Sequence, residues 1–181
     1  MKLKLLILVL ALQCAWLLGT TFQQERALRV GRTIMLETAP VDPRDLLRGD
    51  YLILNYKIST VSANLFSPPL EADLPQGTTV WVTLALSTNQ FHVVTRASTS
   101  EFSPEANEVL VRSKSTSRRW SSTDSIRLEY GLEKYFVAEG TGNPSGKLTV
   151  QAAVSASGRA LIKQVFLNGQ PYAEAMKNSA H

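Results

Sequence analysis

Residues 48–56, RGDYLILNY, decide the fold class of this chain, because a glycine turn leads directly into a strand predicted over residues 50–59. Side chains of a strand alternate between its two faces. One face of this strand is apolar and consists of Leu52, Leu54, Tyr56 and Ile58. The other face is more polar and consists of Tyr51, Ile53, Asn55 and Lys57. We therefore expect the first face to pack against a hydrophobic core.

A single helical turn is predicted immediately before this strand, over residues 40–49. Asp42 is a good N-cap, because its carboxylate can accept hydrogen bonds from the unpaired amides of the first turn. Pro43 fits the next position, where a missing N–H costs nothing. Asp45 favours the positive end of the turn, and Gly49 can adopt the left-handed conformation that ends it.

Short stretches rich in β-branched and aromatic residues recur along the rest of the chain, separated by linkers with Pro and Gly. Residues 79–86 and 91–97 form a predicted hairpin across residues 87–90. The remaining predicted strands cover residues 33–38, 107–113, 125–132, 134–137, 147–154 and 160–167. This spacing predicts a mainly β domain, an antiparallel or mixed sandwich or barrel, preceded by one N-terminal transmembrane helix.

The predicted helix is the apolar run from Leu5 to Phe22, which follows Lys2 and Lys4 and approaches the length of about 20 residues that a membrane span needs. Two interpretations are open, a cleavable signal peptide and an uncleaved anchor. The run ends without the A-x-A pattern of a cleavage site, and Cys14 lacks the preceding small residue of a lipoprotein signal. The anchor is therefore favoured.

The two lysines favour a start inside the cytoplasm, although three arginines after the span reduce the asymmetry. We predict an anchor with a short helical extension over residues 1–30, a β-rich domain over 31–172 and a tail over 173–181. The domain is expected outside the bacterial cytoplasmic membrane, in the periplasm of a Gram-negative organism. The one cysteine lies in the span, so no disulfide is expected within the domain.

Residues 42–56 resemble the GDYxxLxY family, whose motif is matched by Gly49, Asp50, Tyr51, Leu54 and Tyr56. Residues 133–142, EKYFVAEGTG, resemble a second family motif that usually reads YFVPEG, with alanine here in place of proline. The resemblance implies a membrane-anchored bacterial protein without an established activity. It also implies a neighbour or fusion partner among the multi-pass membrane proteins.

These motifs supply the candidate binding or structural residues, which are Asp42, Arg44, Arg48, Gly49, Asp50, Tyr51, Leu54, Tyr56, Tyr135, Glu139 and Gly140. Two interpretations are open for the charged members. Arg48 and Asp50 can lock the turn through ion pairs or form part of a ligand site. Glu139 can act as an acid or ion ligand, or hydrogen-bond the loop backbone. The structural interpretation is favoured, because capped turns that lead into core strands are common.

Metal binding and histidine catalysis have little support in the sequence. His92 is the only histidine before the terminal His181, and the domain has no thiol that could bind a metal. Its neighbours in the predicted strand are Phe91 and Val93, a setting in which a structural histidine is usual. We therefore predict no catalytic residue, no metal and no cofactor.

One enzymatic alternative needs no histidine. Type I signal peptidases place a β-rich domain behind an N-terminal anchor and use a Ser nucleophile with a Lys base. Their segment S-M-x-P-T-L-x-x-G-D resembles the region from Pro43 to Asp50. Alignment on the proline or on the Gly-Asp pair places Pro40 or Val41 at the nucleophile, so a peptidase of this kind would lack its serine.

The net charge of +4 includes a basic cluster in the middle of the chain, made of Arg112, Lys114, Arg118 and Arg119 beside Trp120. Basic and aromatic residues together can bind nucleic acid. A membrane-tethered domain more often meets anionic headgroups or envelope polymers, so nucleic acid is not expected as a partner. A solvated loop is favoured over anion contact.

Together these patterns predict a non-catalytic accessory or interaction module for a multi-pass membrane protein. Two alternatives stay open. One is a signal-peptidase-like β domain, active or inactive. The other is binding of an envelope polyanion or of lipid headgroups.

Overall fold

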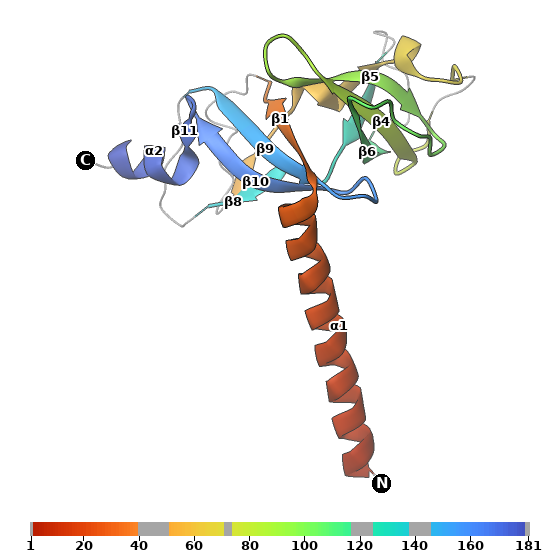
Figure 1. The fold of residues 1–181 in the computed structure, drawn as a ribbon, viewed down its shortest axis with the longest axis vertical. Helices are drawn as coiled ribbons and strands as arrows, with labels where there is room; N and C mark the ends of the chain where they lie inside the picture. Colours follow the sequence, from red (N-terminus) through yellow and green to blue (C-terminus); the bar gives the residue numbers. More distant parts are fainter. Residues whose placement is uncertain (1, 40–50, 71–73, 117–124, 138–145, 180–181) are drawn as a thin grey trace.

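The computed structural model describes residues 2–39, 51–70, 74–116, 125–137 and 146–179, and its described elements are mainly β (Figure 1). The helices and strands are α1 (Lys2–Val30), β1 (Arg32–Glu37), β2 (Tyr51–Ile53), β3 (Thr60–Ser62), β4 (Thr79–Leu86), β5 (His92–Ser98), β6 (Glu108–Ser115), β7 (Ser125–Glu129), β8 (Lys134–Phe136), β9 (Leu148–Val154), β10 (Ala160–Leu167), β11 (Gln170–Pro171) and α2 (Tyr172–Ser179). The helical turn predicted over residues 40–49 lies outside the described residues.

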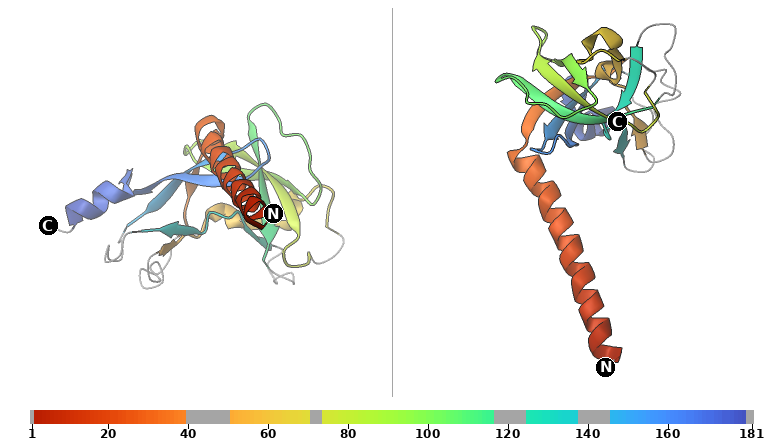
Figure 2. Two further views of the ribbon diagram at one scale, coloured as in Figure 1. Left: turned by 90° about the horizontal axis from the view of Figure 1, so that it is seen from below. Right: turned by 90° about the vertical axis from the view of Figure 1, so that its right-hand side faces the viewer.

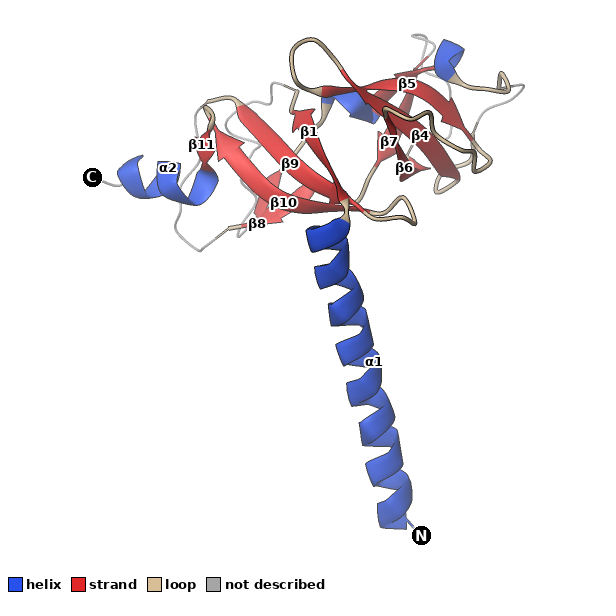
Figure 3. Cartoon of the chain, in the orientation of Figure 1, coloured by secondary structure: helices blue, strands red, loops and turns tan. Residues whose placement is uncertain are grey.

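The described strands form three antiparallel sheets, which confirms the predicted fold class. A four-stranded sheet has the order β1-β9-β10-β11, and a five-stranded sheet has the order β3-β7-β6-β4-β5. Strands β2 and β8 form a separate two-stranded ribbon. Figure 3 shows all the strands gathered above α1, and α2 at the opposite end of the four-stranded sheet from β1.

One hydrophobic cluster joins all three sheets. The face predicted to be buried in residues 50–59 is confirmed, since Leu52, Leu54, Tyr56 and Ile58 are all buried. The predicted single strand is wrong in its length, because β2 ends at Ile53 and a 3₁₀ turn follows at Lys57–Ser59. Ser59 closes this turn by donating its N–H to the carbonyl oxygen of Tyr56 at 3.0 Å. The alternation of buried side chains holds as far as Ile58 and changes phase at the turn, where Ser59 is buried as well and Val61 is the next buried residue.

The β4–β5 hairpin and β10 lie where the sequence predicts them. Besides the 3₁₀ turns at Lys57–Ser59 and Ala63–Leu65, the short strands β3 and β11 and helix α2 were not predicted. Strand β3 has three residues and α2 has eight, so neither is long enough to carry a clear hydrophobic pattern. Helix α2 lies in the segment that was expected to be a tail.

Helix α1 is a continuous helix of 29 residues that projects away from the strands, as the right-hand view of Figure 2 shows. It is long and apolar enough to cross a membrane, a property that signal sequences share. Helix α1 continues beyond the apolar run as far as Val30. Gly31 follows at once, and its N–H donates to the carbonyl oxygen of Ala27 at 3.0 Å.

No spacer separates α1 from β1, and the junction at Gly31 is closely packed. A Cβ atom at Gly31 would clash with the carbonyl oxygen of Ala27 and would lie 2.9 Å from that of Val154 in β9. Both contacts are with backbone atoms, which cannot rotate away as a side chain can. A glycine is therefore required for this passage from helix to strand.

The end of β1 is fastened by a carboxylate between two lysines. Glu37 pairs with Lys147 at 2.6 Å and with Lys57 at 2.7 Å. The hydrogen bonds from Lys147 and then from Lys57 lower the pKa of Glu37 below its ordinary value of 4.5. The two ion pairs connect the end of β1 with Lys147, just before β9, and with the 3₁₀ turn at Lys57. They therefore help to hold the motif segment against the four-stranded sheet.

We expect Glu37→Gln to destabilise the domain in a pH-dependent way. Because the folded-state pKa is depressed, the stabilisation is complete above the ordinary pKa of 4.5 and is lost as the pH falls through the folded-state pKa. Urea unfolding at several pH values should show a gap between wild type and variant that narrows on acidification. The exposed Glu174→Gln in α2 is the control. A gap that stays constant or widens at low pH would contradict the assignment.

Candidate functional site

The β2–β8 ribbon brings together the two motif segments singled out in the sequence. Tyr51 lies opposite Phe136, Leu52 opposite Tyr135, and Ile53 opposite Lys134. Because the pairing is antiparallel and side chains alternate, each face of the ribbon combines residues from both segments. The two motifs therefore form one structural unit.

The inner face of the ribbon is part of the core. Leu54 follows β2 and donates its N–H to the carbonyl oxygen of Glu133 at 2.8 Å. The half-buried ring of Tyr135 meets that of Tyr172 at the start of α2, edge to face at 5.9 Å. Leu54 and Tyr135 thus have structural roles, since Leu54 extends the pairing of the two motif segments and Tyr135 joins the ribbon to α2.

Two buried tyrosines fix the segment that leads into β8. The hydroxyl of Tyr56 donates to the carbonyl oxygen of Leu132 at 2.7 Å, and that of Tyr130 donates to the carbonyl oxygen of Ile58 at 2.8 Å. Burial, with the nearby Glu133 carboxylate as a smaller cause, raises the pKa of both phenols above the ordinary value. They therefore remain neutral donors in the folded protein.

The outer face of the ribbon exposes an aromatic and cationic surface, which we call the ribbon patch: Tyr51, Ile53, Lys134 and Phe136. The rings of Tyr51 and Phe136 lie 6.0 Å apart, tilted by 59°. The Lys134 ammonium lies 5.2 Å from the centre of the Tyr51 ring. Phe136 is 74% exposed. Figure 1 shows β8 at the lower edge of the domain, at the level where α1 enters it.

The remaining predicted residues divide between the surface and the undescribed segments. Arg112 and Lys114 are exposed on β6, and Lys114 lies opposite Glu129 of β7. The predicted contacts Asp42, Arg44, Arg48, Gly49, Asp50, Arg118, Arg119, Trp120, Glu139 and Gly140 lie outside the described residues. Anion contact by the basic cluster therefore stays a prediction.

His92 connects two sheets. Its Nδ1 accepts a hydrogen bond from the backbone N–H of Met35 at 3.1 Å. The ring therefore pairs a backbone amide of the edge strand β1. Burial and the charge of Arg32 lower the pKa of His92. Because Nδ1 accepts the N–H of Met35, it carries no proton of its own, and this favours the neutral ring. Within the described part of the chain, no three His, Cys, Asp or Glu side chains are grouped to hold a metal.

Phe136 and Lys134 were missed as site residues in the sequence. The alternation of residues 134–137 indicated a strand, but the partner strand and its register place Phe136 beside Tyr51. Asn55, on the same predicted face as Tyr51, instead accepts a hydrogen bond from Arg127 at 2.8 Å. Tyr51 and Asn55 thus differ in role although the sequence places them on one face, because Tyr51 pairs with β8 and Asn55 binds Arg127.

These features define a β-rich domain carried on one long apolar helix, with its two sequence motifs paired in a single ribbon. The family model described as GDYXXLXY protein matches residues 13–165, from within α1 to β10. The chain belongs to the GDYXXLXY family. No similar protein was found among the curated proteins, and none among the solved structures.

Proposed function

We propose that this chain is a non-catalytic accessory module, anchored by α1 in the bacterial cytoplasmic membrane with its β domain outside the cytoplasm, and that it binds a multi-pass membrane protein. The observation that carries the proposal is the ribbon patch. Phe136 leaves most of its ring in solvent beside Tyr51 and Lys134. Aromatic side chains are enriched at protein interfaces, where they supply a large share of the binding energy.

The position of the patch supports a partner in the same membrane. Strand β8 lies at the base of the domain, at the level where α1 enters (Figure 1). With α1 in the bilayer, the patch is close to the extracytoplasmic ends and loops of neighbouring spans. Both sequence motifs contribute to it, which gives the paired motifs a role beyond core packing.

Crosslinking in cells followed by purification of the full-length chain tests this proposal. We expect wild type to recover one multi-pass membrane protein and Phe136→Ser to recover it about tenfold less or worse, since an aromatic anchor contributes about 2 kcal/mol or more. Leu86→Ser is the matched control, because Leu86 is a 62% exposed apolar residue in the distant β4–β5 hairpin. Thermal unfolding verifies that both variants are folded.

Equal recovery with Phe136→Ser and Leu86→Ser would contradict the ribbon patch as the contact surface. If no multi-pass protein is recovered with any variant, the accessory function itself is contradicted. The signal-peptidase-like alternative stays a prediction, and Pro40 and Val41, which align with its nucleophile, lie outside the described residues.

A further inference from the structure

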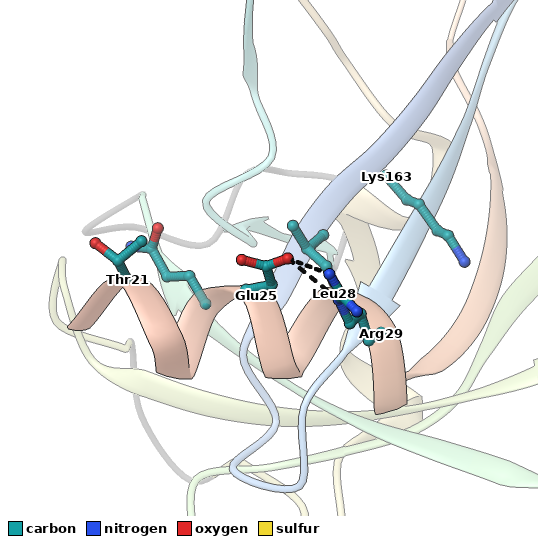
Figure 4. A pocket seen from close by; sticks show the side chains of 6 residues that line it. Thr21, Glu25, Leu28, Arg29 and Lys163 are labelled. Carbon is teal, nitrogen blue, oxygen red and sulfur yellow. Dashed lines mark hydrogen bonds and ion pairs between the residues drawn. The ribbon is translucent and has the colours of Figure 1, made fainter. Parts of the chain in front are cut away.

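The junction of α1 and the four-stranded sheet contains an open recess of about 610 Å³, lined by Thr21, Gln24, Glu25, Leu28, Arg29 and Lys163. Figure 4 shows Thr21, Glu25, Leu28 and Arg29 on α1 and Lys163 on the neighbouring β10. Leu28 is half-buried and the charged residues are exposed. The recess thus combines an apolar base with two cations and one carboxylate.

Lys163 is placed by an irregularity of β10. The pairing with β9 runs from Ile162–Ala152 directly to Gln164–Gln151, so Lys163 is the extra residue of a β-bulge. Bulges redirect a side chain and are enriched next to functional sites. Lys163 has no ion-pair partner among the described residues, whereas the Arg29 guanidinium is held by Glu25 at 2.6 Å. The recess therefore offers one uncommitted positive charge.

The recess begins where the apolar run of α1 ends and extends across the thickness of a bilayer's headgroup layer. The apolar run ends at Phe22, and Arg29 lies seven residues later, which is about 10 Å along a helix axis. The headgroup layer on each side of a bilayer is about 5–8 Å thick. With α1 in the membrane, Thr21 to Arg29 span this layer, and Lys163 faces it from the domain.

We propose that this recess binds the headgroup of an anionic phospholipid, with its phosphodiester at Lys163 and Arg29 and its acyl chains along the apolar part of α1. Gln24 and Thr21 line the same space and offer polar groups to the glycerol hydroxyls. One uncommitted cation matches the single negative charge of a phosphodiester. This inference rests on the proposed membrane anchorage of α1 and is independent of the ribbon patch.

Native mass spectrometry of the full-length chain from nanodiscs with equal amounts of phosphatidylglycerol and phosphatidylcholine tests the proposal. We expect wild type to retain phosphatidylglycerol preferentially, and Lys163→Glu to retain about tenfold less, because a charge reversal removes one attraction and adds one repulsion. Lys163→Arg should retain the lipid. Lys177→Glu is the control, since it makes the same charge change at an exposed site in α2.

Equal retention in Lys163→Glu and Lys177→Glu would overturn the site. Competition by soluble glycerol 1-phosphate as effective as by the lipid would also overturn it, since it would indicate a general phosphate site without a role for the acyl chains. The partner experiment has a separate readout. Loss of lipid in Lys163→Glu with partner recovery intact supports the lipid site alone, whereas loss of partner in Phe136→Ser with lipid retained concerns only the ribbon patch.

Discussion

Tyr56→Ala is expected to lower the free energy of unfolding by about 3–5 kcal/mol, the range for truncation of a buried aromatic residue. Tyr56 is 2% exposed, and its hydroxyl donates to the Leu132 carbonyl oxygen at 2.7 Å. The variant leaves a cavity in the core and an unpaired carbonyl group. Urea unfolding of the full-length chain in detergent micelles, followed by near-ultraviolet circular dichroism, measures the change.

Tyr51→Ala is the matched control, because it removes the same side chain from the exposed face of the same motif. We expect a smaller loss of about 1 kcal/mol there, because Tyr51 is half-buried and its ring meets Phe136 and Lys134 on the outer face of the ribbon. Tyr56→Phe should fall between the two, at about 1–2 kcal/mol, since it leaves the Leu132 carbonyl group unpaired and keeps the ring. A similar loss for Tyr51→Ala and Tyr56→Ala would contradict the division of the motif into a core face and an exposed face.

Gly158→Val is expected to cost about 3 kcal/mol or more, because two independent penalties add. Gly158 has φ of +75° in the turn between β9 and β10, a conformation that β-branched residues avoid at a cost of about 1–3 kcal/mol. A Cβ atom there would also lie 2.8 Å from the Trp81 ring and 3.2 Å from the backbone nitrogen of Arg112. Crowding of this kind typically adds about 1–3 kcal/mol.

Gly131→Val separates the two penalties. Gly131 has a similar φ of +79°, but a Cβ atom there would meet nothing within 4 Å. The difference between the two variants in urea unfolding therefore measures the contact of the β9–β10 turn with Trp81 and Arg112. If the two variants lose the same stability, the turn does not pack against the five-stranded sheet as described.

Much of the fold was accessible from local patterns, because strand alternation and turn composition are local properties. The apolar face of residues 52–58 and the β4–β5 hairpin could be predicted in this way. The 3₁₀ turn at Lys57–Ser59 could not, since no glycine or proline marks it in the sequence. Helix α2 has eight residues, too few for a periodic pattern to indicate it.

The candidate sites depended on long-range geometry. Phe136 is ordinary in the sequence and becomes notable only through the register that places it opposite Tyr51. Lys163 is likewise one lysine among several until the β9–β10 pairing shows it as a bulge residue beside α1. Motif residues alone indicated where the ribbon lies along the chain, but not which side chains its outer face presents.

The closely packed passage at Gly31 has a mechanical consequence. A flexible tether would let the domain swing, but here the last turn of α1 and the first residues of β1 share backbone contacts with β9. The junction therefore couples α1 to the four-stranded sheet, so a tilt or rotation of the helix is expected to turn the sheet with it. If α1 is anchored in a membrane as proposed above, contacts that reorient the helix also reorient the domain.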